Sequence, residues 1–373
     1  MSSRNGKKKI GLIGRIIWLF NILFALTLLA SYLSPYVNPK ETTLFAFLGL
    51  SYLILLLLNA LFMLFWMIRG RRKFLLSLII ILIGYQPLIR HIQVLPGRES
   101  PKDGTTMIMS YNVQNMAHSN IGIHKANLKN EIYGFIESEG GDIICLQEFA
   151  HGGRDFSAVI NEMATQTQYP YCYYSKYYPR AINNIYGMVI LSRYPAIRTG
   201  NILQTGKHHQ FGMYADLLVK GDTIRVYNIH LASVKLRHDD YQFVDDITRG
   251  QAEKDKLRRA SSSIVRKLQV AFKHRSKQVE VVMQSLADCP YPLILCGDFN
   301  DTPLSYAYRK VSKGLNDAFV NAGYGLGNTF TGNLPPVRID FILHSPSFNS
   351  YEFEVHDVLL SDHYPVSVNI NMN

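Results

Sequence analysis

Cysteine and tryptophan are scarce in this sequence, with four and two residues among 373. Four cysteines are too few for a scaffold held together by disulfides, and the length excludes a mini-protein. Hydrophobic residues make up 47% of the chain, including 19 Phe and 23 Tyr, which excludes wholesale disorder. The length indicates two domains or one large one.

Acidic residues are nearly absent from the first hundred positions, where only Glu41 and Glu99 stand against 12 Lys and Arg. The rest of the chain carries a net charge of +1, so the total of +11 belongs almost entirely to the N-terminal segment. A basic balance can indicate nucleic acid, an acidic lipid surface or membrane topology. Its location here favours membrane topology.

The same segment contains three runs without a charged residue, at 16–33, 43–68 and 74–89. About 20 apolar residues are needed to cross the hydrocarbon core of a bilayer. The first two runs approach or exceed that length, whereas the third has 16 residues and is marginal. We expect residues 1–95 to be a membrane anchor with two or three transmembrane helices. A cleaved signal peptide is the alternative for the first run.

Loop charges predict the orientation of this anchor. Basic residues precede the first run and cluster at 69–73, whereas the loop at 34–42 has only Lys40. By the positive-inside rule, the N-terminus and the 69–73 loop face the cytoplasm. Three spans of the cytoplasmic (inner) membrane then place everything after a linker at 96–104 on the periplasmic or extracellular side. If the third run lies in the interface instead, that region is cytoplasmic.

Residues 105–373 alternate apolar runs with stretches of helical periodicity and predict one α/β or α+β domain. Helices are expected at 125–139 and 156–167, followed by a helical stripe from Leu257 to Leu286. Strands are expected at 107–111, 142–146, 187–191, 223–229, 293–296, 339–343 and 366–370.

Polar side chains that suit a magnesium site follow the predicted strands. Asn112 and Glu148 come just after the first two strands, and Asp362 precedes the last. Strand ends are where a sheet holds functional groups at the edge of a cleft. Carboxylate and amide oxygens are hard ligands, which Mg²⁺ prefers.

Proton-transfer groups occupy similar positions. Asp298 and Asn300 lie two residues apart on one loop, so both side chains can point the same way. His230 ends another strand and His363 follows Asp362, and both can carry protons near neutral pH. Singly, each residue has a structural explanation, such as a turn at Asp298. As a set they predict a catalytic site.

Seven motifs connect these residues along the chain. They are Asn112, Gln147-Glu148, Ser192-Arg193-Tyr194-Pro195, Asn228-Ile229-His230-Leu231, Gly297-Asp298-Phe299-Asn300, Arg338-Ile339-Asp340 and Ser361-Asp362-His363. In this order they resemble the endonuclease/exonuclease/phosphatase family over about residues 105–373. The resemblance implies a four-layer sandwich, with two mixed β-sheets face to face and helices outside. It also implies hydrolysis of a phosphoester by water with Mg²⁺, or with Mn²⁺ as the alternative ion.

The resemblance also implies roles for the matching residues. Glu148 would hold the metal ion, helped by Asn112 and, directly or through water, by Asp362. Asp298 would orient and deprotonate the attacking water, and Asn300 would donate a hydrogen bond to the phosphate. Such a reaction needs cations and donors placed around the phosphoryl oxygens in advance.

Two histidines complete the implied site. His363, held by Asp340, would stabilise the phosphoryl oxygens or act as the base, and His230 would act as an acid or contact an oxygen. Abasic-site endonuclease-like members have an acid where this chain has Gln114, and a tyrosine where it has His230. This difference disfavours that branch and leaves the deoxyribonuclease, sphingomyelinase and inositol 5-phosphatase branches open.

Three further features are explained best as structure. Ten basic residues between Arg249 and Lys277 predict a solvated helix face, with an anionic lipid or nucleic-acid partner as the alternative. The tyrosine-rich stretch 169–178 predicts an edge strand, with a rim for lipid or bases as the alternative. His208-His209 lacks metal-ligand spacing and indicates a loop.

The four cysteines divide into two pairs. Cys145 and Cys296 fall within predicted strands and are expected to be small core residues. Cys172 and Cys289 could pair in a disulfide if the domain lies outside the cytoplasm.

The predicted function is therefore that of a membrane-embedded phosphodiesterase, nuclease or phosphatase. Its substrate would be nucleic acid or a lipid or inositol headgroup, and no obligate protein partner is evident. The near-neutral domain gives no general attraction for DNA, which slightly disfavours a nuclease. The alternative is a non-catalytic, membrane-tethered domain that binds a ligand or partner.

Overall fold

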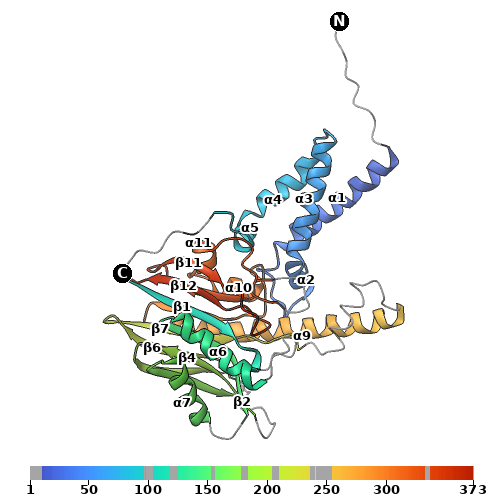
Figure 1. Cartoon of the computed structure of the whole chain (residues 1–373). Coiled ribbons are helices and arrows are strands. Elements are labelled where there is room, and N and C mark those ends of the chain that lie inside the picture. Colours follow the sequence, from blue (N-terminus) through green and yellow to red (C-terminus); the bar gives the residue numbers. More distant parts are fainter. Residues whose placement is uncertain are drawn as a thin grey trace. The chain divides into compact units, whose positions relative to one another are not determined.

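A computed structural model describes residues 11–95, 97, 104–116, 125–152, 156–177, 184–203, 210–235, 240, 254–331 and 337–372 (Figure 1). It divides into two compact units. The first comprises Met1–Leu88 with Leu304–Tyr306, and the second comprises Ile89–Pro303 with Ala307–Asn373. Most of the predicted linker at 96–104, and the His208-His209 pair, lie outside the described residues.

The apolar N-terminal region contains five helices. They are α1 (Leu12–Ser31), α2 (Leu44–Leu50), α3 (Tyr52–Ile68), α4 (Phe74–Ile83) and α5 (Tyr85–His91). Only α1 among them is long and apolar enough by itself to cross a membrane.

The second and third predicted spans are broken helices. The chain bends by 63° between α2 and α3 and by 73° between α4 and α5, so each pair reaches spanning length only as one bent segment. At Gly84, between α4 and α5, a Cβ atom would lie 2.1 Å from the Tyr32 hydroxyl, which explains the glycine there. The breaks within 43–68 and 74–89 were not predicted, because hydropathy does not report them.

Buried polar side chains connect the helices of the first unit. The Asn21 side-chain amide donates to Ser77 Oγ at 2.7 Å, and that hydroxyl donates to Asn59 Oδ1 at 3.2 Å. The Asn59 amide in turn donates to the Phe24 carbonyl at 3.1 Å. These bonds link α1, α3 and α4, where apolar packing alone gives little geometric specificity.

The second unit contains two six-stranded mixed sheets. The first has the order β11-β12-β1-β2-β4-β3 and the second β5-β6-β7-β8-β10-β9. The strands of the first sheet are β1 (Thr105–Asn112), β2 (Ile143–Gly152), β3 (Tyr171–Tyr177), β4 (Asn184–Ser192), β11 (Asn349–Val355) and β12 (Val366–Asn371). Those of the second are β5 (Ala196–Leu203), β6 (Gln210–Val219), β7 (Asp222–His230), β8 (Leu293–Asp298), β9 (Asn316–Asp317) and β10 (Asp340–His344).

Three apolar cores show that the sheets pack face to face with helices outside. The central core joins inner-face residues of both sheets, such as Ile108 and Ile294. A second core lies between the first sheet and helices α6 (Lys125–Glu139) and α7 (Phe156–Thr167). A third lies between the second sheet and helices α9 (Lys254–Ala287) and α10 (Tyr306–Val311). The short helix α11 (Ala318–Ala322) contributes to the central core, and the short 3₁₀ helix η1 (Gln114–Met116) follows β1.

The predicted four-layer arrangement is confirmed, and α6 and α7 have the predicted bounds. The tyrosine-rich stretch forms β3, an edge strand on which the Tyr171 and Tyr173 rings stack at 6.4 Å. The strands β5, β6, β9 and β11 were not predicted. Strand formation depends strongly on burial and on cross-strand packing, which a local sequence pattern does not report.

The suggested disulfide is absent, since all four cysteines are free thiols. Cys172 packs against the core outside the first sheet, whereas Cys289 packs against the core outside the second. The two residues therefore lie in opposite outer layers, which the sequence spacing did not reveal. Cys145 and Cys296 are buried in the central core, as predicted.

Candidate active site

Strand register brings the predicted residues to one end of the sandwich. In the first sheet, parallel pairing of β1 and β2 places Asn112 opposite Gln147, next to Glu148. In the second, Asp298 lies opposite His230 of the parallel strand β7 and opposite Asp340 of the antiparallel strand β10. Asn112 and Asp298, which are 186 positions apart in the sequence, therefore meet.

Buried amides join the two sheets beside this site. Asn112 Nδ2 donates to Asp298 Oδ2 at 2.9 Å, and Gln147 Nε2 donates to Asn228 Oδ1 at 2.7 Å. The Asn228 amide donates in turn to the carbonyls of Leu146 and Val189, both at 2.9 Å. Gln147 and Asn228 belong to the sequence motifs, but their role as a polar connection between the sheets was not predicted.

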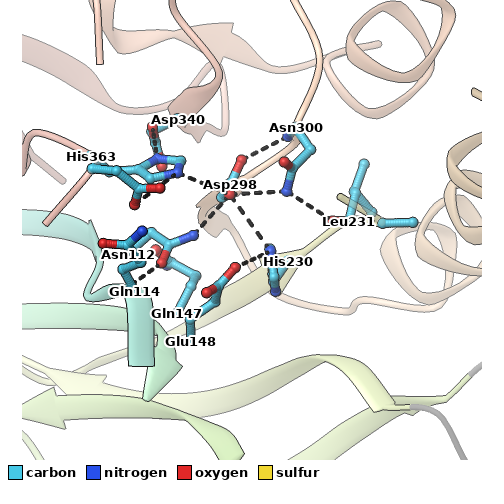
Figure 2. A network of polar contacts seen from close by, with 12 residues as sticks. Asn112, Gln114, Gln147, Glu148, His230, Leu231, Asp298, Asn300, Asp340 and His363 are labelled. Carbon is cyan, nitrogen blue, oxygen red and sulfur yellow. Dashed lines mark hydrogen bonds and ion pairs between the residues drawn. The ribbon is translucent and has the colours of Figure 1, made fainter. Parts of the chain in front are cut away.

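Asp298 is the centre of the site (Figure 2). Its Oδ1 accepts the Asn300 backbone N–H at 2.7 Å, and its Oδ2 accepts the Asn300 side-chain amide at 3.0 Å. The Nε2 atoms of His230 and His363 lie 3.6 and 3.8 Å from Oδ2. Burial raises the pKa of Asp298; His363 and His230 oppose the rise, and the Asp340 charge adds to it.

Glu148 and Asn300 have left-handed backbone conformations. Glu148 has φ 49° and lies in β2 where its pairing with β4 shifts register, which is the mark of a β-bulge. Its carboxylate accepts the Asn115 side-chain amide at 3.2 Å and lies 3.3 Å from His230 Nε2. Asn300 has φ 51°. Such strained positions cluster at functional sites.

The motif Ser361-Asp362-His363, which precedes β12, supplies Asp362 and His363 to the site. His363 Nδ1 lies 2.9 Å from Asp340 Oδ2, and the Ser361 hydroxyl donates to the Asn112 carbonyl at 2.7 Å. The Ser361 bond ties this loop to the end of β1. Burial raises the pKa of Asp362 to about 6; His363 opposes this rise and the Glu148 charge adds to it.

The eight predicted site residues are thus gathered, but they form two sets of donors. Asp298, Asp340 and His363 have potential ligand atoms within 4.8 Å of one another, although His363 and Asp340 are already bonded to each other. The predicted ligands Glu148 and Asp362 retain side-chain exposures of 25% and 21%. This buried group of two acids and one histidine could hold a divalent cation.

Side chains of helix α9 hold the loops that follow β7 and β8, an interaction that was not predicted. Arg275 is buried, where its Nε donates to Asp301 Oδ2 and its Nη1 to the Ala232 carbonyl, both at 2.9 Å. Gln278 Oε1 accepts the Ala232 N–H at 2.8 Å. Arg275 was counted with the solvated basic face, yet its spacing of three from Phe272 and four from Val279 places it on the apolar stripe.

Comparison with known proteins agrees with this geometry. Residues 109–363 match the Endonuclease/Exonuclease/phosphatase family, and residues 14–91 match a domain of unknown function (DUF8431). A search of curated proteins gave no match.

Solved structures share the fold. The mannosyl-6-phosphatase of Bacteroides thetaiotaomicron VPI-5482 is 18% identical, with 71% of this chain and 99% of that chain covered and a TM-score of 0.50. A family protein from Leptotrichia buccalis C-1013-b is 16% identical, with coverages of 70% and 98% and a TM-score of 0.51. The family match spans more than half of this chain. The chain therefore belongs to the endonuclease/exonuclease/phosphatase family.

Proposed function

We propose that this protein is a membrane-anchored, Mg²⁺-dependent hydrolase that cleaves a phosphoester by attack of water at phosphorus. Family membership supports phosphoester hydrolysis in general. The observation that carries the proposal is the buried carboxylate of Asp298, which has amides of Asn112 and Asn300 and two imidazoles around it. Binding alone does not require a carboxylate with this surrounding.

Glu148, Asn112 and Asp362 would hold the ion. The donor set fits Mg²⁺, which takes oxygen ligands, uses few carboxylates and keeps several waters. Partial exposure of both carboxylates leaves access for those waters. When bound, the ion would neutralise charge that develops on the phosphoryl oxygens.

Asp298 would take a proton from the attacking water while the oxygen of that water forms its bond to phosphorus. A raised pKa suits this role, since a base is most effective when its pKa approaches the working pH. The Asn300 amide donates both of its N–H groups, to Asp298 and to the Leu231 carbonyl. It would exchange one of these bonds for a phosphoryl oxygen when substrate binds beside the base.

The two histidines would have different tasks. His363 carries a proton on Nδ1 toward Asp340 and directs Nε2 into the site, where its positive charge stabilises phosphoryl oxygens. His230, on the side of Glu148, would protonate the leaving oxygen as its bond to phosphorus breaks. The proton from water then resides on Asp298. The leaving group departs with a neutral hydroxyl, because its oxygen has received the proton of His230.

The test uses the full chain in lipid nanodiscs with Mg²⁺, Mn²⁺ or EDTA. Substrates are plasmid DNA, RNA, a lipid phosphodiester, a phosphoinositide, a sugar phosphate and a generic diester. Asp298→Ala should reduce the rate on the preferred substrate by about 10²–10⁴-fold. Asp222→Asn, at the exposed opposite end of β7, is the matched control and should keep full activity.

A second variant addresses the ion directly. Glu148→Gln should weaken Mg²⁺ binding in calorimetry while the protein stays folded. Full activity in Asp298→Ala, or no Mg²⁺-dependent hydrolysis of any of these substrates, would contradict the proposal. The latter result would favour the ligand-binding alternative.

We further propose that the apolar N-terminal region anchors the chain in the cytoplasmic membrane, with the catalytic unit on its outer side. The composition of α1 and of the two bent pairs supports anchoring, and the basic cluster at 69–73 supports this orientation. Alkaline phosphatase fused after Asn373 should be active, whereas GFP fused at the same position should not fluoresce. A fluorescent GFP fusion with inactive phosphatase would place the catalytic unit in the cytoplasm.

A further inference from the structure

The chain that follows α5 runs along the loop after α11, within the second unit. The backbones of Gln93 and Gly325 form an antiparallel bridge with two N–H···O bonds of 2.8 Å. A Cβ atom on Gly97 would lie 2.1 Å from the Ala322 carbonyl oxygen, so the backbones are in contact there too. Gln93 therefore pairs with Gly325, and Gly97 packs against Ala322, so the two segments run in opposite directions.

Four large apolar side chains project to solvent from these two adjacent segments. Val94 and Leu95 are each 75% exposed, Tyr324 is 68% exposed and Leu326 is 47% exposed. We call Val94, Leu95, Tyr324 and Leu326 the apolar patch. Apolar side chains gathered in this way typically mark an interaction surface.

The backbone holds these side chains outward instead of letting them collapse onto the core. Gly325 has φ +76° and Gly327 has φ +59°, conformations that favour glycine, so Tyr324 and Leu326 lie on a tight turn. The two hydrogen bonds to Gln93 fix that turn. The exposure of the patch is thus a property of an ordered structure.

Chain continuity identifies what covers the patch. Val94 comes three residues after His91, the last residue of the bent apolar pair α4–α5. Three residues span at most about 11 Å even when fully extended. If α4–α5 lies in the bilayer, the patch is held at the depth of the lipid headgroups, where tyrosine with its apolar ring and polar hydroxyl is favoured.

The segment before the patch is also tied to the strand that carries Asp340. The Arg90 carbonyl accepts a bond of 2.8 Å from Arg338 Nη2, two residues before Asp340. Arg338 is buried and paired with Asp317 at 2.9 Å. A surface fixed at the patch would therefore have a defined orientation relative to β10.

We propose that the apolar patch docks the catalytic unit onto the phospholipid surface of the membrane that anchors the chain. The proposal rests on the anchoring proposed above and concerns the interface of a bilayer, not a second protein. Docking would stop the catalytic unit from rotating freely on its connection to the anchor, so its site would keep a constant orientation relative to the membrane surface. Substrates presented at that surface are favoured over those in bulk solution.

The experiment measures lipid contact at single labelled positions in the full chain. In a Cys172→Ala/Cys289→Ala background, Leu326→Cys is labelled with the fluorophore NBD and reconstituted in phosphatidylcholine–phosphatidylglycerol nanodiscs. The control is Ile197→Cys, which is also exposed but lies on β5, at the opposite edge of the second sheet from β9. Leu19→Cys, exposed on α1, reports anchoring.

Lipids that carry a doxyl quencher near the headgroup should quench the 326 label severalfold more than the 197 label. Quenching at 19 with equal, weak quenching at 326 and 197 would overturn docking while leaving anchoring intact. A 326 label that lipids do not quench but that is shielded from aqueous iodide would indicate a protein partner and also overturn it. Quenching at none of the three positions would overturn docking and anchoring together. Because activity is not the readout, failure here is distinct from failure of the proposed hydrolysis.

Discussion

His363 Nδ1 lies 2.9 Å from Oδ2 of Asp340, and both residues are buried. Burial by itself lowers the pKa of the imidazole, but the charges of Asp340 and Asp298 outweigh it and raise the pKa to about 10. His363 is therefore an imidazolium at neutral pH. This favours charge stabilisation over general-base catalysis as its proposed role.

Asp340→Asn should remove the charge that does most to keep His363 protonated. The pKa of His363 then falls, so the protonated form is lost at lower pH and the alkaline limb of the pH–rate profile moves toward neutrality. We expect the rate at pH 8 to drop by about 10²–10⁴-fold, with a smaller loss at pH 6. The profile of Asp222→Asn should match that of the unmodified chain. An alkaline limb that does not move in Asp340→Asn would show that Asp340 does not set the charge of His363.

Gly297→Ala should separate the two strands that carry His230 and Asp298. A Cβ atom at Gly297 would lie 2.1 Å from the Ile229 carbonyl oxygen, and neither backbone can move without disturbing the β7–β8 ladder. We expect the free energy of unfolding to fall by about 3 kcal/mol and the activity to be lost. Gly134→Ala is the control, because that helical position is open and alanine there should add about 1 kcal/mol. Equal stability of the two variants in urea titrations would contradict this reasoning.

Arg275→Met should leave the buried carboxylate of Asp301 without its partner. Breaking such a pair by removing one member costs about 3–5 kcal/mol. The loop at Ala232 also loses a bond, so the rate should fall while the substrate KM changes less. Arg266→Met, exposed on the same helix, should be nearly neutral.

The double variant Arg275→Met/Asp301→Asn separates loss of the pair from damage to packing. It removes the unpaired charge, so thermal denaturation should show it to be more stable than Arg275→Met alone. A double variant no more stable than the single one would mean that packing, and not the ion pair, accounts for the loss.

Asn59→Ala should weaken the apolar helix bundle. It removes the acceptor of Ser77 and the donor to Phe24 that connect α3 with its neighbours. Polar contacts of this kind contribute about 0.6–2 kcal/mol each between helices in lipid. Thr27→Ala is the control, because the Thr27 hydroxyl donates to the Leu23 carbonyl of its own helix. Denaturant titration in detergent micelles should rank Asn59→Ala below Thr27→Ala, and the reverse order would contradict the role of Asn59.

The sequence by itself determined the features that depend on local pattern. Spacing of Leu128, Ile132 and Ile136 identified α6 with the bounds that the structure has, and uncharged runs identified the apolar segments. The candidate residues were also identified from sequence, because each lies in a short motif at the end of an apolar run. From Asn112 to His363, all eight meet in one site.

Only the tertiary structure decided which groups act on which. Burial raises the pKa of Asp298 and of Asp362, whereas the charges of Asp340 and Asp298, distant in sequence, raise the pKa of His363 against the effect of burial. The breaks at Ser51 and Gly84 and the separation of Cys172 from Cys289 were likewise invisible to hydropathy or spacing. Arg275 is a partner of Asp301 because a 34-residue helix packs against the sheet, and a count of basic residues cannot reveal that. Periodicity records which face a residue prefers, whereas strand register and packing between sheets set its neighbours, its solvation and therefore its chemistry.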